Sequence, residues 1–243
     1  MATPLHSPPT FYPRRVNQYV PKMRYSADIG SNGLYRVSFG SPVVADADGL
    51  LNGVNASDGE MMDLTGLAIG AAIQSGVIGA IGRIADATYG RNVTVAGVTS
   101  PHDIDIEGFD YLGQPMQETI AAAATSGAGA KAFKEVTKVL FTDGGDADCD
   151  VGWGDVLGLP YGSIKVLAAE LAGVTETTLP TLVSSIRTDP HTIVTADPRG
   201  TIDLNSALAG TEVTALLVAE SFINAIGNGG LHGIAHFMGT TLA

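Results

Sequence analysis

Three aspartates at alternate positions, Asp146, Asp148 and Asp150, are the first residues whose spacing could do chemistry. This spacing matches the start of a calcium-binding loop, in which several oxygens converge on one cation. The match then ends, because the sixth position of such a loop is Val151 instead of glycine and the twelfth is Leu157 instead of glutamate. The pattern therefore favours a solvated acidic turn, and we expect no metal site.

His232 and His236 form a second candidate metal pair. On a helix this spacing would place both imidazoles on one face, but glycines before, between and after the pair disfavour a helix. On a strand the two side chains share a face yet lie about 13 Å apart, too far to bind one metal ion. We therefore expect two structural histidines.

No catalytic motif stands out elsewhere, since the chain has no Gly-x-Ser-x-Gly elbow, no P-loop and no Gly-x-Gly-x-x-Gly. Cys149 lies between aspartates, whose charge disfavours a reactive thiolate. Asp103, Asp105 and Glu107 alternate with apolar residues, so solvation on the wet face of a strand explains them. The sequence predicts a protein that is not an enzyme and has no cofactor.

Short strands separated by turns are the elements that would carry these residues. The stretch Tyr89–Phe141 shows the pattern best, with period-two alternation over 91–97, 102–109 and 131–139 and a turn at 110–115. Further strands are expected at 34–39, 181–186, 191–195, 212–222 and 233–237, whereas 163–171 fits either a strand or a helix. Composition predicts loops at 46–49, 52–59, 143–155 and 197–200.

The composition of the 243 residues supports an all-β body, because only 16% are charged while 31 are Gly and 12 are Pro. The single cysteine excludes a disulfide within the chain. We divide the chain into an arm at residues 1–27 and a β-rich body at 28–243, with sub-lobes near 28–90 and 91–243 as one option.

Residues 1–27 hold five prolines, which favour an extended arm instead of a helix. Aromatic and basic side chains alternate along this arm, and these are the types that anchor protein interfaces. Disorder is the alternative interpretation of the same segment. The expected partner contacts are Arg14, Arg15, Tyr19, Lys22, Arg24, Tyr25 and, outside the arm, Trp153.

Trp153 is flanked by Gly152 and Gly154, which give the indole little local cover. It could insert into the protein's own core or anchor a partner or sister subunit.

Charge is placed unevenly along the chain. The arm carries four basic residues and no acid, so the body holds the remaining nine basic residues and all 25 acidic ones. An acidic body repels nucleic acid, and we expect no nucleic-acid partner.

Leu64–Gly82 has no charged residue and contains Gly66-x-x-x-Gly70, which is a pattern of membrane helices. Its five glycines, its polar residues and its flanks, which lack a positive-inside pattern, favour two short buried strands meeting near residues 74–76. The proline-rich N-terminus lacks the apolar region of a signal peptide. We expect neither a membrane span nor export.

Four segments carry a resemblance to a known family: Arg91–Val95 (RNVTV), Gly108–Ile120 (GFDYLGQPMQETI), Lys131–Val136 (KAFKEV) and Asp155–Tyr161 (DVLGLPY). Together they resemble a block found in capsid decoration, or cement, proteins of tailed bacteriophages. The resemblance covers about residues 83–161, a third of the chain, and leaves the arm and the C-terminal third uncovered. It carries no catalytic residues.

The resemblance implies a jelly-roll-like or β-sandwich body that sits on the outer capsid surface of the virion after synthesis in the host cytoplasm. It also implies binding to the major capsid protein, with neighbouring subunits clamped together, as a homo-oligomer such as a dimer or trimer. Two rival functions stay open. One is a tail or head-completion component, and the other is a carbohydrate-active β-sandwich enzyme with paired carboxylates.

Overall fold

The computed structural model describes residues 34–56, 61–63, 78–80, 82–98, 102–122, 126–142, 146–185, 197 and 199–219. Within these ranges every regular element is a β-strand, and the strands pair antiparallel. The expected all-β class is confirmed. The predicted arm at 1–27, the strands expected at 191–195 and 233–237, and the two histidines near the C-terminus lie outside the described residues.

The first sheet has six strands, in the order β4-β5-β10-β7-β8 with β3 paired to β10. Its strands are β3 (Met61–Asp63), β4 (Ile78–Ala80), β5 (Arg83–Ile84), β7 (His102–Phe109), β8 (Pro115–Ala122) and β10 (Glu135–Phe141).

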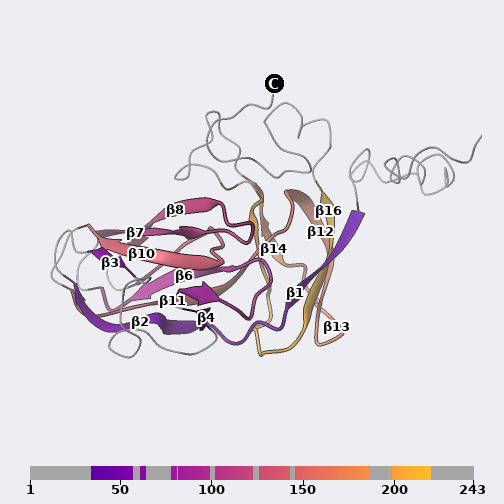
Figure 1. Cartoon of the computed structure of the whole chain (residues 1–243). Coiled ribbons are helices and arrows are strands. Elements are labelled where there is room, and N and C mark those ends of the chain that lie inside the picture. Colours follow the sequence, from indigo (N-terminus) through magenta and orange to yellow (C-terminus); the bar gives the residue numbers. More distant parts are fainter. Residues whose placement is uncertain are drawn as a thin grey trace, which may run out of the picture.

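The second sheet also has six strands, in the order β14-β15-β11-β6-β9 with β2 paired to β11. Its strands are β2 (Asp46–Ala56), β6 (Arg91–Ala96), β9 (Ser126–Ala128), β11 (Asp146–Gly158), β14 (Thr181–Val183) and β15 (Thr201–Asp203). In Figure 1 the strands β7, β8 and β10 lie over β2, β6 and β11, as two layers of a sandwich.

A third sheet of four strands lies at one end of this sandwich, at the right of Figure 1. Its order is β1-β16-β12-β13, with bounds β1 (Leu34–Gly40), β12 (Ser163–Leu171), β13 (Val174–Thr175) and β16 (Val213–Ala219). β1 pairs with β16, and β2 pairs with β11. Strands before and after residue 90 therefore share sheets, so a division into sub-lobes near that residue does not follow the fold.

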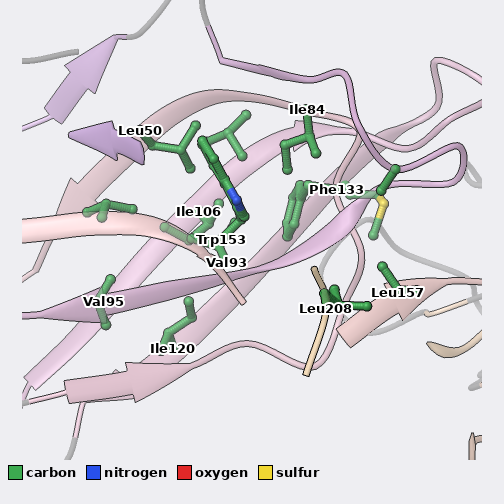
Figure 2. Close-up of a cluster of buried hydrophobic side chains, with 14 of the residues drawn as sticks. Leu50, Ile84, Val93, Val95, Ile106, Ile120, Phe133, Trp153, Leu157 and Leu208 are labelled. Carbon is green, nitrogen blue, oxygen red and sulfur yellow. The ribbon is translucent and has the colours of Figure 1, made fainter. Parts of the chain in front are cut away.

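One buried apolar cluster joins the three sheets, with Ile106 from the first, Val93 from the second and Leu217 from the third. Figure 2 shows Trp153 inside this core, among Leu50 and Ile84. Alternation on β7 decides which side chains enter it. Ile104 and Ile106 are buried as expected, while Asp103, Asp105 and Glu107, which alternate with them, are partly or fully exposed.

Several sequence predictions are confirmed by the strand bounds. β7 and β6 form where alternation predicts them, the turn between β7 and β8 spans 110–114, and β16 occupies most of the late apolar segment. The ambiguous segment at 163–171 is the strand β12. The strand expected from residue 131 begins only at Glu135, because the β-pairing of residues 131–134 is limited to an isolated bridge between Phe133 and Arg91.

The loops predicted at 46–49, 52–59 and 143–155 are wrong for most of their length, because β2 and β11 form there. These two long strands pair with each other over an irregular register with several bulges. Glycine and aspartate are turn residues in a local reading of the sequence, but in β11 they lie in a bulged strand that packs closely against β2. At Gly152 a Cβ atom would lie 1.8 Å from the backbone oxygen of Asp46, so only glycine fits.

Candidate functional site

The residues predicted to contact a partner fall into two groups. Those of the arm lie outside the described residues: Arg14, Arg15, Tyr19, Lys22, Arg24 and Tyr25. Trp153 is described, and its side chain is fully buried in the protein's own core. The partner-contact prediction for Trp153 is therefore wrong, because the indole packs against Gly49 and has no exposed surface to offer.

The aspartates of the supposed calcium loop lie along β11 instead of in a turn. The Asp150 side chain accepts a hydrogen bond from the Gly53 backbone N–H at 2.8 Å, which links β11 to β2. Asp148 has a left-handed backbone, with φ of 58°. Among the described residues, no group of three or more His, Cys, Asp or Glu side chains is placed to hold a metal ion.

Arg91 lies at the start of β6, and its charged side chain is fully buried. Its guanidinium donates to the backbone oxygens of Gly154 at 2.7 Å and Val43 at 2.9 Å. It also forms ion pairs with Asp86 at 2.9 Å and Asp155 at 3.3 Å. One side chain therefore ties the chain before β2, the turn before β6 and the middle of β11 together.

Burial lowers the pKa of Arg91, and the carboxylates of Asp86 and Asp155 oppose that effect. The Asp86 carboxylate is itself buried and accepts a further hydrogen bond from the Val43 backbone N–H at 3.0 Å. The sequence pattern predicts that Arg91 lies in a strand but does not predict its burial. Its position directly before the Val93 and Val95 alternation was the available signal.

A second buried ion pair, between Arg199 and Asp110, joins the turn between β7 and β8 to the segment before β15. The Asp110 side chain also accepts from the backbone N–H groups of Leu112 at 2.8 Å and Gln114 at 2.9 Å, and so organises the β7–β8 turn. The Arg199 guanidinium lies 4.9 Å from the ring centre of Tyr111, a cation–π contact. This ion pair therefore fixes the turn against the segment before β15.

Tyrosines continue from this ion pair toward the third sheet. Tyr111 packs edge-on against Tyr89 with ring centres 5.0 Å apart, and Tyr35 packs edge-on against Tyr161 at 5.5 Å. The Tyr35 hydroxyl lies 2.5 Å from the Ser163 hydroxyl, which joins β1 to β12. Burial raises the pKa of Tyr111 to about 12, and it also raises the pKa of Tyr35.

One face of the third sheet carries an exposed ion pair. Arg36 on β1 pairs with Glu170 on β12 at 2.8 Å, and both side chains are exposed. Thr214 lies between them and accepts from Arg36 at 3.2 Å. These residues line a shallow hollow of about 240 Å³. The hairpin that follows β12 presents Val174, which is 70% exposed.

A larger open hollow of about 590 Å³ lies beside β6 and β9. Small side chains form most of its lining, including Ala47, Thr94 and Ala128. Small side chains of this kind offer a ligand few polar or ionisable groups. Among the described residues, the buried ion pairs therefore hold strands together. The two surface hollows are lined by common polar and apolar side chains.

Comparisons with protein-family models, with curated proteins and with solved structures find no match to this chain. In the part of the chain that the structure describes, no helix has the length and apolar character needed to cross a membrane. Most of the apolar segment Leu64–Gly82 lies outside that part, and its described end contributes the short strand β4.

Proposed function

We propose that this chain is a virion structural protein that binds the outer surface of a tailed-phage capsid and stabilises the assembled shell. It would clamp neighbouring subunits of the major capsid protein, and it would do so as a dimer or trimer. The observation that carries the proposal is the block at residues 83–161. Its sequence resembles that of decoration proteins, and its strands β6, β7, β8, β10 and β11 build both layers of the sandwich.

Two further observations support this function. Arg91 and Arg199 are buried and bound to carboxylates, so both serve to hold the body together. The chain also separates charge, with four basic residues and no acid at 1–27 and an acidic remainder. A basic segment suits acidic groups on a neighbouring subunit, and the acidic body suits an outer surface that does not bind nucleic acid.

Shell stabilisation follows from differential affinity. A protein that binds the assembled shell better than free subunits shifts the equilibrium toward the shell by mass action. Because a shell presents many symmetric copies of the same site, modest contacts at each site are sufficient. The required property is therefore preference for the assembled state, which sedimentation can measure.

The test uses the full chain and a variant that lacks residues 1–25, each mixed with undecorated capsids and with free major capsid protein. The full chain is expected to co-sediment with capsids and to bind free subunits weakly. We expect the truncated chain to fold but to bind capsids with a Kd at least about tenfold higher, a loss of roughly 1.4 kcal/mol.

A matched variant with Arg14, Arg15, Lys22 and Arg24 replaced by glutamine separates charge from length. If charge acts, this variant binds weakly too, and added salt weakens the full chain toward the same level. Unchanged affinity after truncation would refute the role of the arm. Failure of the full chain to bind capsids would refute the proposed function.

A further inference from the structure

Asn52 and Gly53 are neighbours in the middle of β2, and both residues are exposed. The register between β2 and β11 shifts at this point, because these two residues face the single residue Asp150 of β11. Two residues opposite one make a β-bulge, which interrupts the regular pairing. The Gly53 backbone is left-handed, with φ of 57°, as glycine readily allows. The bulge therefore presents an Asn-Gly pair to solvent, and this pair plays no part in the function proposed above.

An asparagine that precedes a glycine can react with its own backbone. The glycine nitrogen attacks Cγ of the asparagine side chain and closes a succinimide ring, because glycine has no Cβ atom to obstruct the ring. The reaction requires an acceptor for the proton of the attacking nitrogen and a proton for the nitrogen that leaves as ammonia. It also requires water to open the ring. A folded strand supplies these only where its contacts match the reacting atoms.

The contacts at the bulge match the reacting atoms. The Gly53 N–H, which carries the attacking nitrogen, donates to the Asp150 carboxylate at 2.8 Å. The Asn52 side-chain nitrogen, which would leave, donates to the Asp48 carboxylate. A hydrogen bond from the attacking nitrogen to an ionised carboxylate is also the geometry from which the proton transfers. Both hydrogen bonds are exposed, so water can reach the reacting atoms.

We propose that Asn52 is a deamidation site of the folded protein, with Asp150 as the proton acceptor. The Gly53 nitrogen attacks Cγ of Asn52 while its proton passes to the Asp150 carboxylate. The N–Cγ bond forms, the Cγ–Nδ2 bond breaks, and the departing nitrogen takes the proton from Asp150 through water. Ammonia leaves and a succinimide remains. One water then opens the ring at either of its carbonyl carbons, which gives an aspartyl or an isoaspartyl residue at position 52.

Both products change the contacts that hold β2 against β11. Each replaces the amide with a carboxylate, so the hydrogen bond from Asn52 to Asp48 becomes a contact between like charges. The isoaspartyl product also adds one carbon atom to the backbone of β2, next to the hydrogen bond that joins Gly53 to Asp150. We therefore expect deamidation to weaken the pairing of β2 with β11.

The test follows deamidation at position 52 over time in the purified full chain at neutral pH, in native buffer and in guanidinium chloride. Trypsin cleaves after Arg36 and Arg83, and the peptide between them holds Asn52 but neither of the other two Asn-Gly pairs, at 32–33 and 228–229. Fragmentation in the mass spectrometer assigns the gain of about one mass unit to a residue. We expect the folded chain to react at least about threefold faster than the denatured chain, in which Asp150 is no longer beside Gly53.

Asp150→Asn is the matched variant, because an amide oxygen can accept the hydrogen bond from Gly53 but does not take up its proton. We expect it to lower the rate in the folded chain by at least about threefold and to leave the rate in denaturant unchanged. Asn52→Gln, whose longer side chain does not close this ring, should show no gain of mass at position 52. Asn52→Asp carries one of the two products from the start and should melt below the wild type.

A folded wild-type chain that reacts no faster than the denatured chain would overturn the proposal, because the fold would then protect Asn52. This comparison does not depend on the folding of any variant. Equal rates in folded wild type and folded Asp150→Asn would refute the role of Asp150 as proton acceptor.

Discussion

At the scale of single residues, Arg91 is a charged group that is buried in the core and depends on its partners. Its guanidinium is fully buried and makes contacts with two backbone oxygens and two carboxylates. Such a group is not a source of stability by itself, since desolvation offsets much of the attraction. Removing it, however, would leave Asp86 buried with its charge uncompensated.

We therefore predict that Arg91→Met lowers the free energy of unfolding by about 3–5 kcal/mol. Chemical denaturation followed by tryptophan fluorescence measures this directly, because Trp153 is the single tryptophan and lies in the core. Arg36→Ala is the matched control. It breaks the exposed pair with Glu170, and we expect a loss of at most about 1 kcal/mol. Equal losses of stability in the two variants would contradict the role of Arg91 as the buried partner of Asp86.

A second prediction at this scale concerns Gly152, whose missing side chain leaves room for the backbone of β2. A Cβ atom there would lie 1.8 Å from the Asp46 carbonyl oxygen, which cannot move without breaking the β2–β11 pairing. We expect Gly152→Ala to lower the free energy of unfolding by at least about 2 kcal/mol. The same denaturation experiment measures the loss.

Gly113→Ala gives the comparison for Gly152, because nothing lies within 4 Å of a Cβ atom at that position. Only its left-handed backbone, with φ of +76°, opposes the substitution, at a cost of about 1 kcal/mol. A Gly152→Ala variant as stable as Gly113→Ala would show that β2 does not pack as closely against β11 as described.

At the scale of elements, the strands with clean alternation could be predicted, and the crowded ones could not. The sequence predicts β7 with its bounds and its two faces, because Ile104 and Ile106 alternate with acidic residues. The local sequence predicts loops where β2 and β11 form, because aspartate and glycine are turn residues. The reason for those glycines is a partner strand far away in the chain, which a local pattern does not reveal.

The same limit applies to the buried polar groups. Asp110 was correctly placed in a turn, but its partner Arg199 comes 89 residues later. Likewise, the burial of Arg91 depends on Asp86 and on the backbone of Val43 and Gly154. Sequence pattern assigns such residues to a strand or turn, whereas their burial is set by long-range pairing.

The tyrosines at the junction of the sandwich and the third sheet give a pH prediction. Tyr111 has its pKa raised to about 12 by burial, and the pKa of Tyr35 is raised by the same cause. A raised folded-state pKa means that the unfolded chain loses its proton first. The contribution to stability is therefore complete below about pH 10, the unfolded value, and is lost as pH rises toward 12.

We accordingly expect Tm to fall as the pH is raised from 9 to 11, and to fall less steeply in Tyr111→Phe. Thermal melts followed by circular dichroism at each pH measure both slopes. Tyr111→Phe also loses the hydrogen bond to the Pro160 oxygen at 3.0 Å, so the comparison uses the slopes and not the absolute Tm values. Equal slopes of Tm against pH in the wild type and in Tyr111→Phe would show that Tyr111 does not contribute to the pH dependence.

At the scale of the whole molecule, the body is a β-sandwich with a third sheet at one end, and one core joins them. Its buried ion pairs hold strands and turns together. Its outer surfaces include the face around Arg36 and Glu170 and the exposed Val174. The basic segment at 1–27 is opposite in charge to the rest of the chain. These properties suit a protein that is placed on a surface in many copies.

The most direct test of the proposed function is the number of copies of this chain in each purified virion, measured by quantitative mass spectrometry against the major capsid protein. A decoration protein follows the symmetry of the shell, so the account predicts hundreds of copies, in a fixed ratio to the major capsid protein. A handful of copies would instead indicate a tail or head-completion component, and absence from the virion would contradict the account altogether.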